Sequence, residues 1–148
     1  MGAFIDDWKA RIKYLRKTGA RAPSVSAGKP VNRKRVLIIE DNLDAARALA
    51  MLVADMGHAT EYATRGSSAS ALAKRFRPDV VFLDIGLPDM DGLDVCSQLK
   101  ADPETMQIRV IVITGYAQDE YRIRAKAAGC DVHLVKPTPT RVLEELLD

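Results

Sequence analysis

The sequence of 148 residues lacks any long apolar run. A transmembrane helix needs about 20 consecutive apolar residues, and polar or charged residues interrupt every apolar stretch well before that length. The polar, basic start of the chain also lacks the apolar stretch of a signal peptide. We therefore expect a cytoplasmic protein with no membrane span.

Cysteine is scarce as well, since the chain contains only Cys96 and Cys130. Two cysteines make neither a disulfide framework nor a zinc-binding pattern, so a small fold held together by disulfide bonds or by a zinc ion is excluded. The simplest interpretation is two ordinary thiols in a reducing compartment. The hydrophobic share of 47% and the charged share of 28% are those of a soluble globular domain.

Acidic residues are nearly absent from the start of the chain. Residues 1–35 contain ten Lys/Arg and two acids, whereas residues 36–148 contain twelve Lys/Arg and eighteen acids. A basic arm, residues 1–34, therefore precedes an acidic domain, residues 35–148. Within the arm, apolar residues at helical spacing predict an amphipathic helix over residues 4–15, and residues 20–34 have the composition of a flexible linker.

The basic arm has three interpretations that the sequence leaves open: it packs on the domain, pairs with a partner helix, or is linker from a larger architecture. Its charge also suits anionic surfaces. Because no recognition fold accompanies it, we do not expect nucleic acid as a partner.

From residue 35 onward, short apolar runs alternate with helical patterns. The pattern predicts strands over residues 36–39, 58–63, 80–83, 110–113 and 132–135. It predicts helices over residues 43–56, 67–76, 91–100, 119–128 and 140–147. Strict alternation of this kind gives an α/β fold with a parallel sheet and helices on both faces. Uniformly apolar strands agree with a sheet that is covered on both sides.

Polar side chains follow four of the five predicted strands. Glu40 and Asp41 come after the first, Asp84 after the third, Thr114 after the fourth and Lys136 after the fifth. In parallel α/β sheets, ligands bind beyond the carboxyl ends of the strands. The sequence therefore predicts that these five side chains share one pocket.

The residue types in this pocket favour phosphoryl transfer to Asp84. Carboxylates that are held together repel one another, and Mg²⁺ (or Mn²⁺) relieves this with Asp41 and Asp84 as direct ligands and Glu40 through a water. A carboxylate can attack phosphorus to give an aspartyl phosphate. The ammonium of Lys136 and the hydroxyl of Thr114 would stabilise charge on the phosphoryl oxygens.

Single residues of this set also have purely structural explanations. Asp41 is a suitable N-cap for the helix over residues 43–56, and Lys136 has the character of a solvated surface charge. Their joint placement at four strand ends favours the pocket over these explanations.

Four segments resemble the receiver domain of two-component response regulators: VLIIEDN (36–42), VVFLDIGLPDMDGLDVCSQLK (80–100), VIVITGYA (110–117) and AAGCDVHLVKP (127–137). The resemblance extends over residues 35–148, and the last segment is similar to receivers that work with hybrid histidine kinases. It implies a flavodoxin-like (βα)5 three-layer fold, similar to that of chemotaxis regulators, with strand order 2-1-3-4-5.

The resemblance also implies a role for each residue of the pocket. Glu40 and Asp41 match the acidic pair of the family, and Asp84 matches the phosphoacceptor. Gly86 matches the position whose backbone carbonyl helps to bind magnesium, and Lys136 matches the lysine of the family's site. A cis bond before Pro137 would also follow the family pattern, and the lack of a side chain at Gly86 implies open access to Asp84.

Thr114 matches the hydroxyl that switches conformation in the family, but its usual aromatic partner is missing. The family places Tyr or Phe three residues before the lysine, whereas this chain has His133 there. A swinging His133 and a strand histidine with no switching role remain open alternatives.

The leading hypothesis is a phosphorylation-dependent signalling module. The phosphoryl donor would be a histidine kinase or a histidine phosphotransfer domain, and the output would be contact with a downstream protein, with homodimerisation left open. Because the chain ends after the fifth predicted helix, we expect a stand-alone receiver, a relay intermediate or part of a hybrid kinase. The protein would not be an enzyme, although its aspartyl phosphate would hydrolyse itself.

Two alternatives share this pocket chemistry. A phosphohydrolase of the haloacid dehalogenase type needs a second acid two residues after its nucleophile, and Gly86 occupies that position. A non-phosphorylated interaction module of the same fold usually lacks an acid or the lysine, whereas this chain has all of them.

Overall fold

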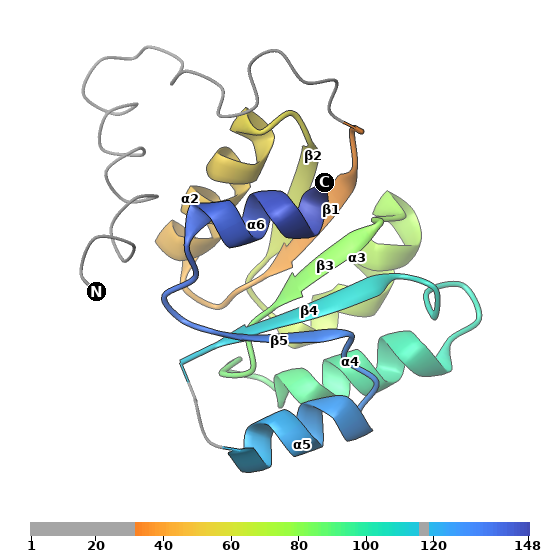
Figure 1. Cartoon of the computed structure of the whole chain (residues 1–148). Helices are drawn as coiled ribbons and strands as arrows, with labels where there is room; N and C mark the ends of the chain where they lie inside the picture. The colour runs from red at the N-terminus through yellow and green to blue at the C-terminus, as the bar shows by residue number, and fades with distance from the viewer. Residues whose placement is uncertain (1–31, 116–118) are drawn as a thin grey trace.

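The computed structural model describes residues 32–115 and 119–148. Five parallel strands form one sheet in the order β2-β1-β3-β4-β5 (Figure 1), which is the flavodoxin-like order predicted from the sequence. The strands are β1 (Arg35–Ile39), β2 (Ala59–Ala63), β3 (Val80–Leu83), β4 (Arg109–Thr114) and β5 (Val132–Val135). The helix and linker predicted for residues 1–34 lie almost wholly outside the described residues and stay a prediction.

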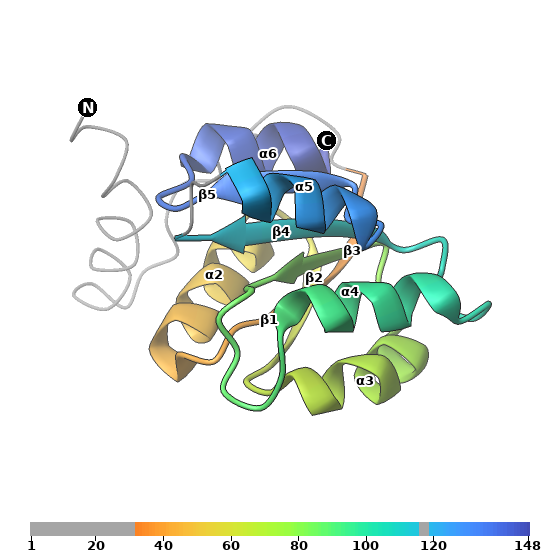
Figure 2. The ribbon, with the colours of Figure 1, turned by 90° about the horizontal axis from the view of Figure 1, so that it is seen from below.

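Helices connect the strands and cover both faces of the sheet (Figures 1 and 2). They are α2 (Leu43–Asp55), η2 (Gly66–Ser68), α3 (Ala69–Phe76), α4 (Gly92–Ala101), α5 (Asp119–Ala127) and α6 (Thr140–Leu147). Each prediction from the sequence differs from these bounds by a few residues at most. None of the helices in the described part of the chain has the length and apolarity to span a bilayer.

The apolar strands divide their side chains between two cores. Successive residues of a strand point to opposite faces, so Leu37 and Ile39 pack beneath α3, α4 and α5, whereas Val36 and Ile38 pack beneath α2 and α6. All four side chains are almost completely buried. Burial on both faces fixes β1 inside the sheet and explains why β1 contains no polar residue after Arg35.

Short polar residues begin the two helices nearest to the predicted pocket. Asn42 caps α2 by accepting a hydrogen bond from Ala45 N at 3.0 Å, and Asp91 caps α4 by accepting one from Leu93 N at 2.9 Å. The structural explanation offered for Asp41 is therefore wrong, because its neighbour Asn42 serves as the cap. The side chain of Asp41 is exposed at the pocket instead.

The loop between β3 and α4 is held against the rest of the domain at two points. Asp89 accepts hydrogen bonds from the backbone N–H groups of Gly66 and Ser67 at 2.9 and 2.8 Å. These bonds lower the pKa of Asp89 to about 2. At the other end, Gly92 N donates to Ile85 O at 3.1 Å. The loop that follows Asp84 is thus fixed by the Asp89 carboxylate and by a main-chain hydrogen bond between its two ends.

The close approach at Gly92 generates a stability prediction. A Cβ at Gly92 would lie 2.4 Å from Asp84 O and 2.7 Å from Ile85 Cα, so the backbone must shift. We expect Gly92→Ala to lower the free energy of unfolding by about 2 kcal/mol in urea denaturation, despite the better helix propensity of alanine. Gly86→Ala is the matched control, since its Cβ meets only Asp84 Oδ1 at 3.8 Å. Equal stability of the two variants would contradict the steric argument.

Candidate functional site

Three carboxylates meet at the carboxyl edge of the sheet. Glu40 and Asp41 follow β1, and Asp84 follows β3, its central neighbour. One oxygen from each residue lies within 4.8 Å of the others, so the three form a candidate cation site. Main-chain hydrogen bonds fix the register, because Glu40 N donates to Ala63 O at 3.0 Å and Asp84 N donates to Ile39 O at 2.9 Å.

The ammonium of Lys136 lies between two of these carboxylates. Its Nζ is 3.0 Å from Glu40 Oε2 and 3.3 Å from Asp84 Oδ2. Lys136 follows β5 and is positioned by its own backbone, whose N–H donates to Thr114 O at 2.7 Å. Lys136 therefore connects the edge strand β5 to the carboxylates that follow the inner strands β1 and β3.

Every oxygen of Glu40 and Asp84 has a donor within reach. The second oxygen of Asp84, Oδ1, accepts a hydrogen bond from Gly86 N at 3.1 Å. The second oxygen of Glu40, Oε1, accepts one from Asn42 N at 3.3 Å. Such bonds hold both carboxylates in place.

The site carries an excess of negative charge. Burial raises the pKa of Glu40 to about 7, and the hydrogen bond and charge of nearby Asp84 act in the same direction. Burial alone would lower the pKa of Lys136, but the charges of Asp84 and Glu40 raise it above its usual value. One ammonium thus neutralises the three acids only in part. A hard divalent cation fits a site with this donor set and charge.

Thr114 ends β4 at the same edge, with 0% of its surface exposed. Because Val112 and Val110 face α4 and α5, the alternation of side chains places Thr114 on that face too. His133 pairs with Val112 across the sheet, and its neighbours Val132 and Leu134 face the opposite core. Thr114 and His133 therefore share one face on adjacent strands, as a switch pair requires.

His133 has an unusual environment for a polar side chain. Both ring nitrogens are buried without a hydrogen-bond partner among the described residues. Burial, assisted by the charge of Arg122, lowers the pKa of His133 below its usual 6.5. At neutral pH the ring is therefore uncharged, and no hydrogen bond among the described residues fixes its orientation.

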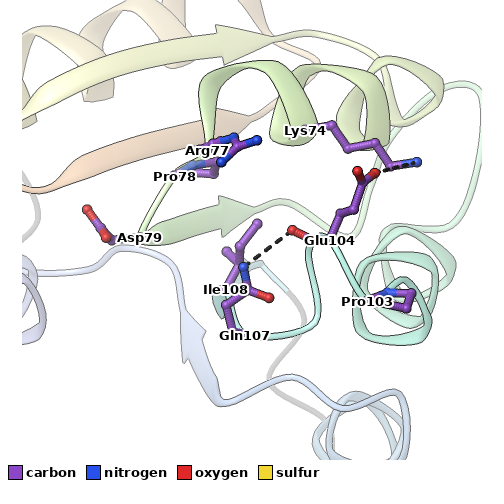
Figure 3. Close-up of a pocket in the computed structure, with 8 residues that line it drawn as sticks. All are labelled: Lys74, Arg77, Pro78, Asp79, Pro103, Glu104, Gln107 and Ile108. Atoms are coloured by element: carbon purple, nitrogen blue, oxygen red, sulfur yellow. Dashed lines mark hydrogen bonds and ion pairs between the residues drawn. The ribbon is translucent and has the colours of Figure 1, made fainter.

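A second concave region lies at the opposite edge of the sheet (Figure 3). Its lining comes from the segments before β3 and β4: Lys74, Arg77, Pro78, Asp79, Pro103, Glu104, Gln107 and Ile108. Part of its charge is already paired, since Lys74 Nζ is 2.8 Å from Asp102 Oδ2 and 3.6 Å from Glu104 Oε2. Asp79 accepts a hydrogen bond from Arg35 N at 2.8 Å. We therefore assign no ligand to this region.

Comparison with known families agrees with the geometry at the carboxyl edge. The response regulator receiver domain matches residues 36–148, which cover all five strands of the sheet. The chain belongs to this family. The receiver fold and the two-component class of the protein, both expected from the sequence, are thereby confirmed.

Individual relatives of this receiver support the assignment. The polar-differentiation response regulator DivK of Brucella anthropi is 39% identical over 106 residues, which are 70% of this chain and 85% of that protein. The DNA-binding dual master transcriptional regulator RpaA of Synechocystis is 33% identical over 103 residues, 70% of this chain and 43% of that one. The DivK match spans most of its protein, whereas the RpaA match covers less than half.

Solved structures show the same fold as this receiver. The signal receiver domain of a signal transduction histidine kinase from Syntrophus aciditrophicus is 30% identical with a TM-score of 0.71 and covers 77% of this chain and 86% of that one. A CheY-like receiver domain protein from Methanospirillum hungatei is 26% identical with a TM-score of 0.72, at 78% and 90% coverage.

Some residues that build the site were not singled out from the sequence for this purpose. Asn42 caps α2 and binds Glu40, and Asp89 anchors the loop after Asp84. An Asn directly before a helical pattern is a cap signal that would have identified the capping role of Asn42.

Lys136 and a cis bond before Pro137 were expected from the family resemblance, and the Lys136–Pro137 bond is cis in the structure.

The raised pKa of Glu40 generates a prediction for the metal-free protein. The folded state keeps the proton of Glu40 up to about pH 7, whereas the unfolded state releases it near pH 4.5. The contribution of this proton to the free energy of unfolding is thus complete below pH 4.5, and it is lost as the pH rises through 7. In EDTA, we expect the free energy of unfolding to fall by about 2–3 kcal/mol between pH 5 and pH 8 because of this group.

The effect of Glu40 is tested by urea denaturation at both pH values. Glu40→Gln should show a smaller fall than the wild type, and Mg²⁺ should restore stability of the wild type at pH 8 because it binds only the folded site. Asp44→Asn is the control, since Asp44 is an exposed acid on α2. An unchanged pH dependence in Glu40→Gln would contradict the assignment.

The unpartnered ring of His133 generates a second prediction. Replacing it by Phe removes two buried nitrogens that have no partner, so His133→Phe should raise the free energy of unfolding by about 1 kcal/mol. Because the pKa of His133 is lowered, folded-state stability is lost as the pH falls, and the gain should be larger at pH 5.5 than at pH 8. His58→Phe is the contrasting variant, since His58 Nδ1 accepts a hydrogen bond from Lys34 N at 3.0 Å. A loss of stability in both variants would contradict this interpretation.

Proposed function

We propose that this receiver accepts a phosphoryl group on Asp84 and signals in its phosphorylated state through protein–protein contacts. The observation that carries the proposal is the position of Lys136, whose ammonium is within 3.3 Å of Asp84 Oδ2 and 3.0 Å of Glu40 Oε2. This arrangement places a fixed positive charge beside a carboxylate nucleophile, with further acids able to hold a cation.

The transfer step exchanges one bond to phosphorus for another. An oxygen of Asp84 attacks the phosphorus of a phosphohistidine, the P–N bond breaks, and the donor imidazole leaves. The Lys136 ammonium stabilises negative charge on the phosphoryl oxygens. The hydroxyl of Thr114, at the end of β4, would bind one of those oxygens and so report the phosphorylated state to the β4–β5 face.

A divalent cation supplies charge neutralisation when it is bound at this site. The carboxylates of Glu40, Asp41 and Asp84, together with the backbone carbonyl of Gly86, are the groups that would hold Mg²⁺ or Mn²⁺. Asp41 is the most exposed of the three acids and needs the least rearrangement to bind. The backbone N–H of Gly86 meanwhile keeps one oxygen of Asp84 in position.

Access to Asp84 favours a partner histidine as the donor. Gly86 is exposed and contributes no side chain, so a kinase or a histidine phosphotransfer domain can reach the carboxylate. The same opening would admit water, so the aspartyl phosphate would hydrolyse itself. The position two residues after Asp84 offers no second acid, so we propose a phosphoacceptor and not a multiple-turnover phosphohydrolase.

The output of phosphorylation would pass through Thr114 to the neighbouring strand. If Thr114 moves toward the phosphoryl group, it leaves space on the face that it shares with His133. A neutral ring without hydrogen bonds can enter that space at little cost. A downstream protein or a second copy of the chain would recognise this change, and binding experiments would identify which of them does.

The proposed phosphorylation is tested by intact mass spectrometry. With Mg²⁺ and a small phosphodonor such as phosphoramidate, the wild-type chain should gain the mass of one phosphoryl group. Asp84→Asn should gain none, because an amide is not a nucleophile toward phosphorus. Lys136→Met should lose at least tenfold in rate, since about 1.4 kcal/mol of transition-state stabilisation corresponds to that factor.

Asp44→Asn is the matched control and should be phosphorylated at the wild-type rate, because Asp44 lies on α2 outside the cluster of acids. A folded wild-type protein that gains no mass in saturating Mg²⁺ would favour the non-phosphorylated interaction module. Repeated turnover of a phosphomonoester would favour the phosphohydrolase.

A further inference from the structure

The two cysteines of the chain lie side by side although they are far apart in the sequence. Cys96 is on α4 and Cys130 is in the loop between α5 and β5, yet their sulfurs are 2.9 Å apart. Both are free thiols in this structure. A disulfide bond is about 2.05 Å long, so each sulfur needs to move by less than about 0.5 Å to form one.

We propose that Cys96 and Cys130 form a reversible intramolecular disulfide, which makes this receiver responsive to oxidants independently of phosphorylation. The sequence alone favoured two unconnected thiols, because nothing in their spacing indicates a contact. The juxtaposition comes from the fold, which packs α4 against the loop that leads into β5.

The backbone around each sulfur is held by contacts of its own. Cys96 is completely buried in the core beneath α4. Cys130 N donates to Ala125 O at 3.0 Å, and the next residue is fixed twice, since Asp131 N donates to Val110 O at 2.9 Å and Val110 N donates to Asp131 Oδ2 at 2.8 Å. The two thiols are therefore preorganised for bond formation with little backbone movement.

A lysine ties the same two elements together. Lys100, one helical turn after Cys96, places its Nζ 2.9 Å from Asp131 Oδ2 and 2.6 Å from Ile108 O. Its aliphatic chain passes within 3.0 Å of the position of a Cβ on Gly129. Lys100 thus closes α4 onto the Cys130 loop whether or not the sulfurs are bonded.

The environment of the pair divides two tasks between the thiols. Cys130 is only half-buried, so a small oxidant enters the pair from its side, whereas Cys96 is shielded. The Cys130 thiol donates a hydrogen bond to Cys96 Sγ, and this bond, with the charge of Lys100, lowers the pKa of Cys96, whereas the same bond and burial raise the pKa of Cys130. Cys96 is therefore the thiolate that attacks the oxidant, and Cys130 is the thiol that then closes the disulfide.

Hydrogen peroxide is an oxidant that balances the reaction. The Cys96 thiolate attacks one oxygen, the O–O bond breaks, and the departing hydroxide takes a proton to leave as water. Cys130 then attacks the sulfenic sulfur of Cys96, the S–O bond breaks, and the hydroxide and the Cys130 proton leave as a second water. Two thiols are oxidised to one disulfide, and one peroxide is reduced to two waters. A dithiol such as dithiothreitol reverses the bond by exchange.

The disulfide would leave the phosphoacceptor pocket intact. Cys130 precedes β5, and Asp131 bonds to Val110 at the start of β4, so the bond lies toward the edge of the sheet opposite to Asp84. What it would restrain is α4 relative to the start of β5, the strand that contains His133. Oxidation would thus stiffen the output strand without removing the phosphorylation site.

The test uses the full chain treated with hydrogen peroxide or with dithiothreitol. After peroxide, the intact mass should fall by that of two hydrogens, and N-ethylmaleimide added in denaturant should label no cysteine. Dithiothreitol should restore the mass and labelling at both cysteines. The oxidised chain should migrate as a monomer without reductant and should melt about 5 °C or more above the reduced chain.

Cys130→Ser and Cys96→Ala are the matched variants. Each should retain its fold by circular dichroism, should form no intramolecular disulfide and should lose the peroxide-dependent rise in melting temperature. Cys130→Ser is the milder change because that position is half-buried, so it keeps the test valid if Cys96→Ala unfolds. A gain of oxygen mass only, a disulfide-linked dimer, or two labelled thiols after peroxide would each overturn the proposal.

Phosphorylation of the oxidised wild type separates this inference from the proposed function. The oxidised chain should still gain one phosphoryl group on Asp84, because the disulfide touches none of the pocket residues. Loss of the phosphoryl gain upon oxidation, with recovery in dithiothreitol, would overturn the claim of independence. Absence of the gain in both redox states would instead count against the phosphoacceptor and leave the disulfide standing.

Discussion

Three carboxylates are crowded together at one edge of the sheet, and the strands, loops and ion pairs around them are arranged to hold them there. Glu40, Asp41 and Asp84 bring ligand oxygens within 4.8 Å of one another, and burial makes their mutual repulsion costly. The ion pairs of Lys136 with two of them offset part of this cost. The remaining negative charge is what a divalent cation and a phosphoryl group can use, so an unfavourable arrangement for folding is a favourable one for the proposed reaction.

Such crowding persists only because the strands beneath it are held from both sides. β1 and β3 are fully apolar at their centres, and their side chains enter two separate cores. The carboxyl ends of these strands then have no freedom to separate, because their backbone groups are paired along the whole sheet. Stability that comes from hydrophobic burial is thus used to keep like charges together.

The loops at the carboxyl edge are held by backbone contacts and short polar caps. Asp89 anchors the loop after Asp84 to η2, and Asp91 both caps α4 and pairs with Arg124 of α5 at 3.0 Å. At the opposite edge, Lys100 and Asp131 make a similar connection between α4 and the loop before β5. Helix α4 is therefore fixed at both ends, and the two cysteines lie near the second of these connections. The ion pair of Asp91 at one edge of the sheet and that of Lys100 at the other thus restrain the same helix, α4.

The order of the strands and the edge at which the polar residues gather follow from the sequence alone. Apolar runs of strand length, each followed by an amphipathic helix, admit few topologies, because parallel strands need crossovers of one hand. The carboxyl ends of such strands must lie at one edge, so Glu40, Asp41, Asp84, Thr114 and Lys136 were placed together without coordinates. Local periodicity and the rules of chain connection contain this information.

The pairing of side chains from distant segments became visible only in the folded chain. Nothing in the spacing of Cys96 and Cys130 indicates a 2.9 Å contact, since it depends on how α4 packs against a loop 34 residues later. The same holds for the unpartnered ring of His133 and for the choice of Asn42 over Asp41 as the cap of α2. Sequence patterns specify which face a residue occupies, whereas atomic contacts depend on packing between elements, which periodicity does not encode.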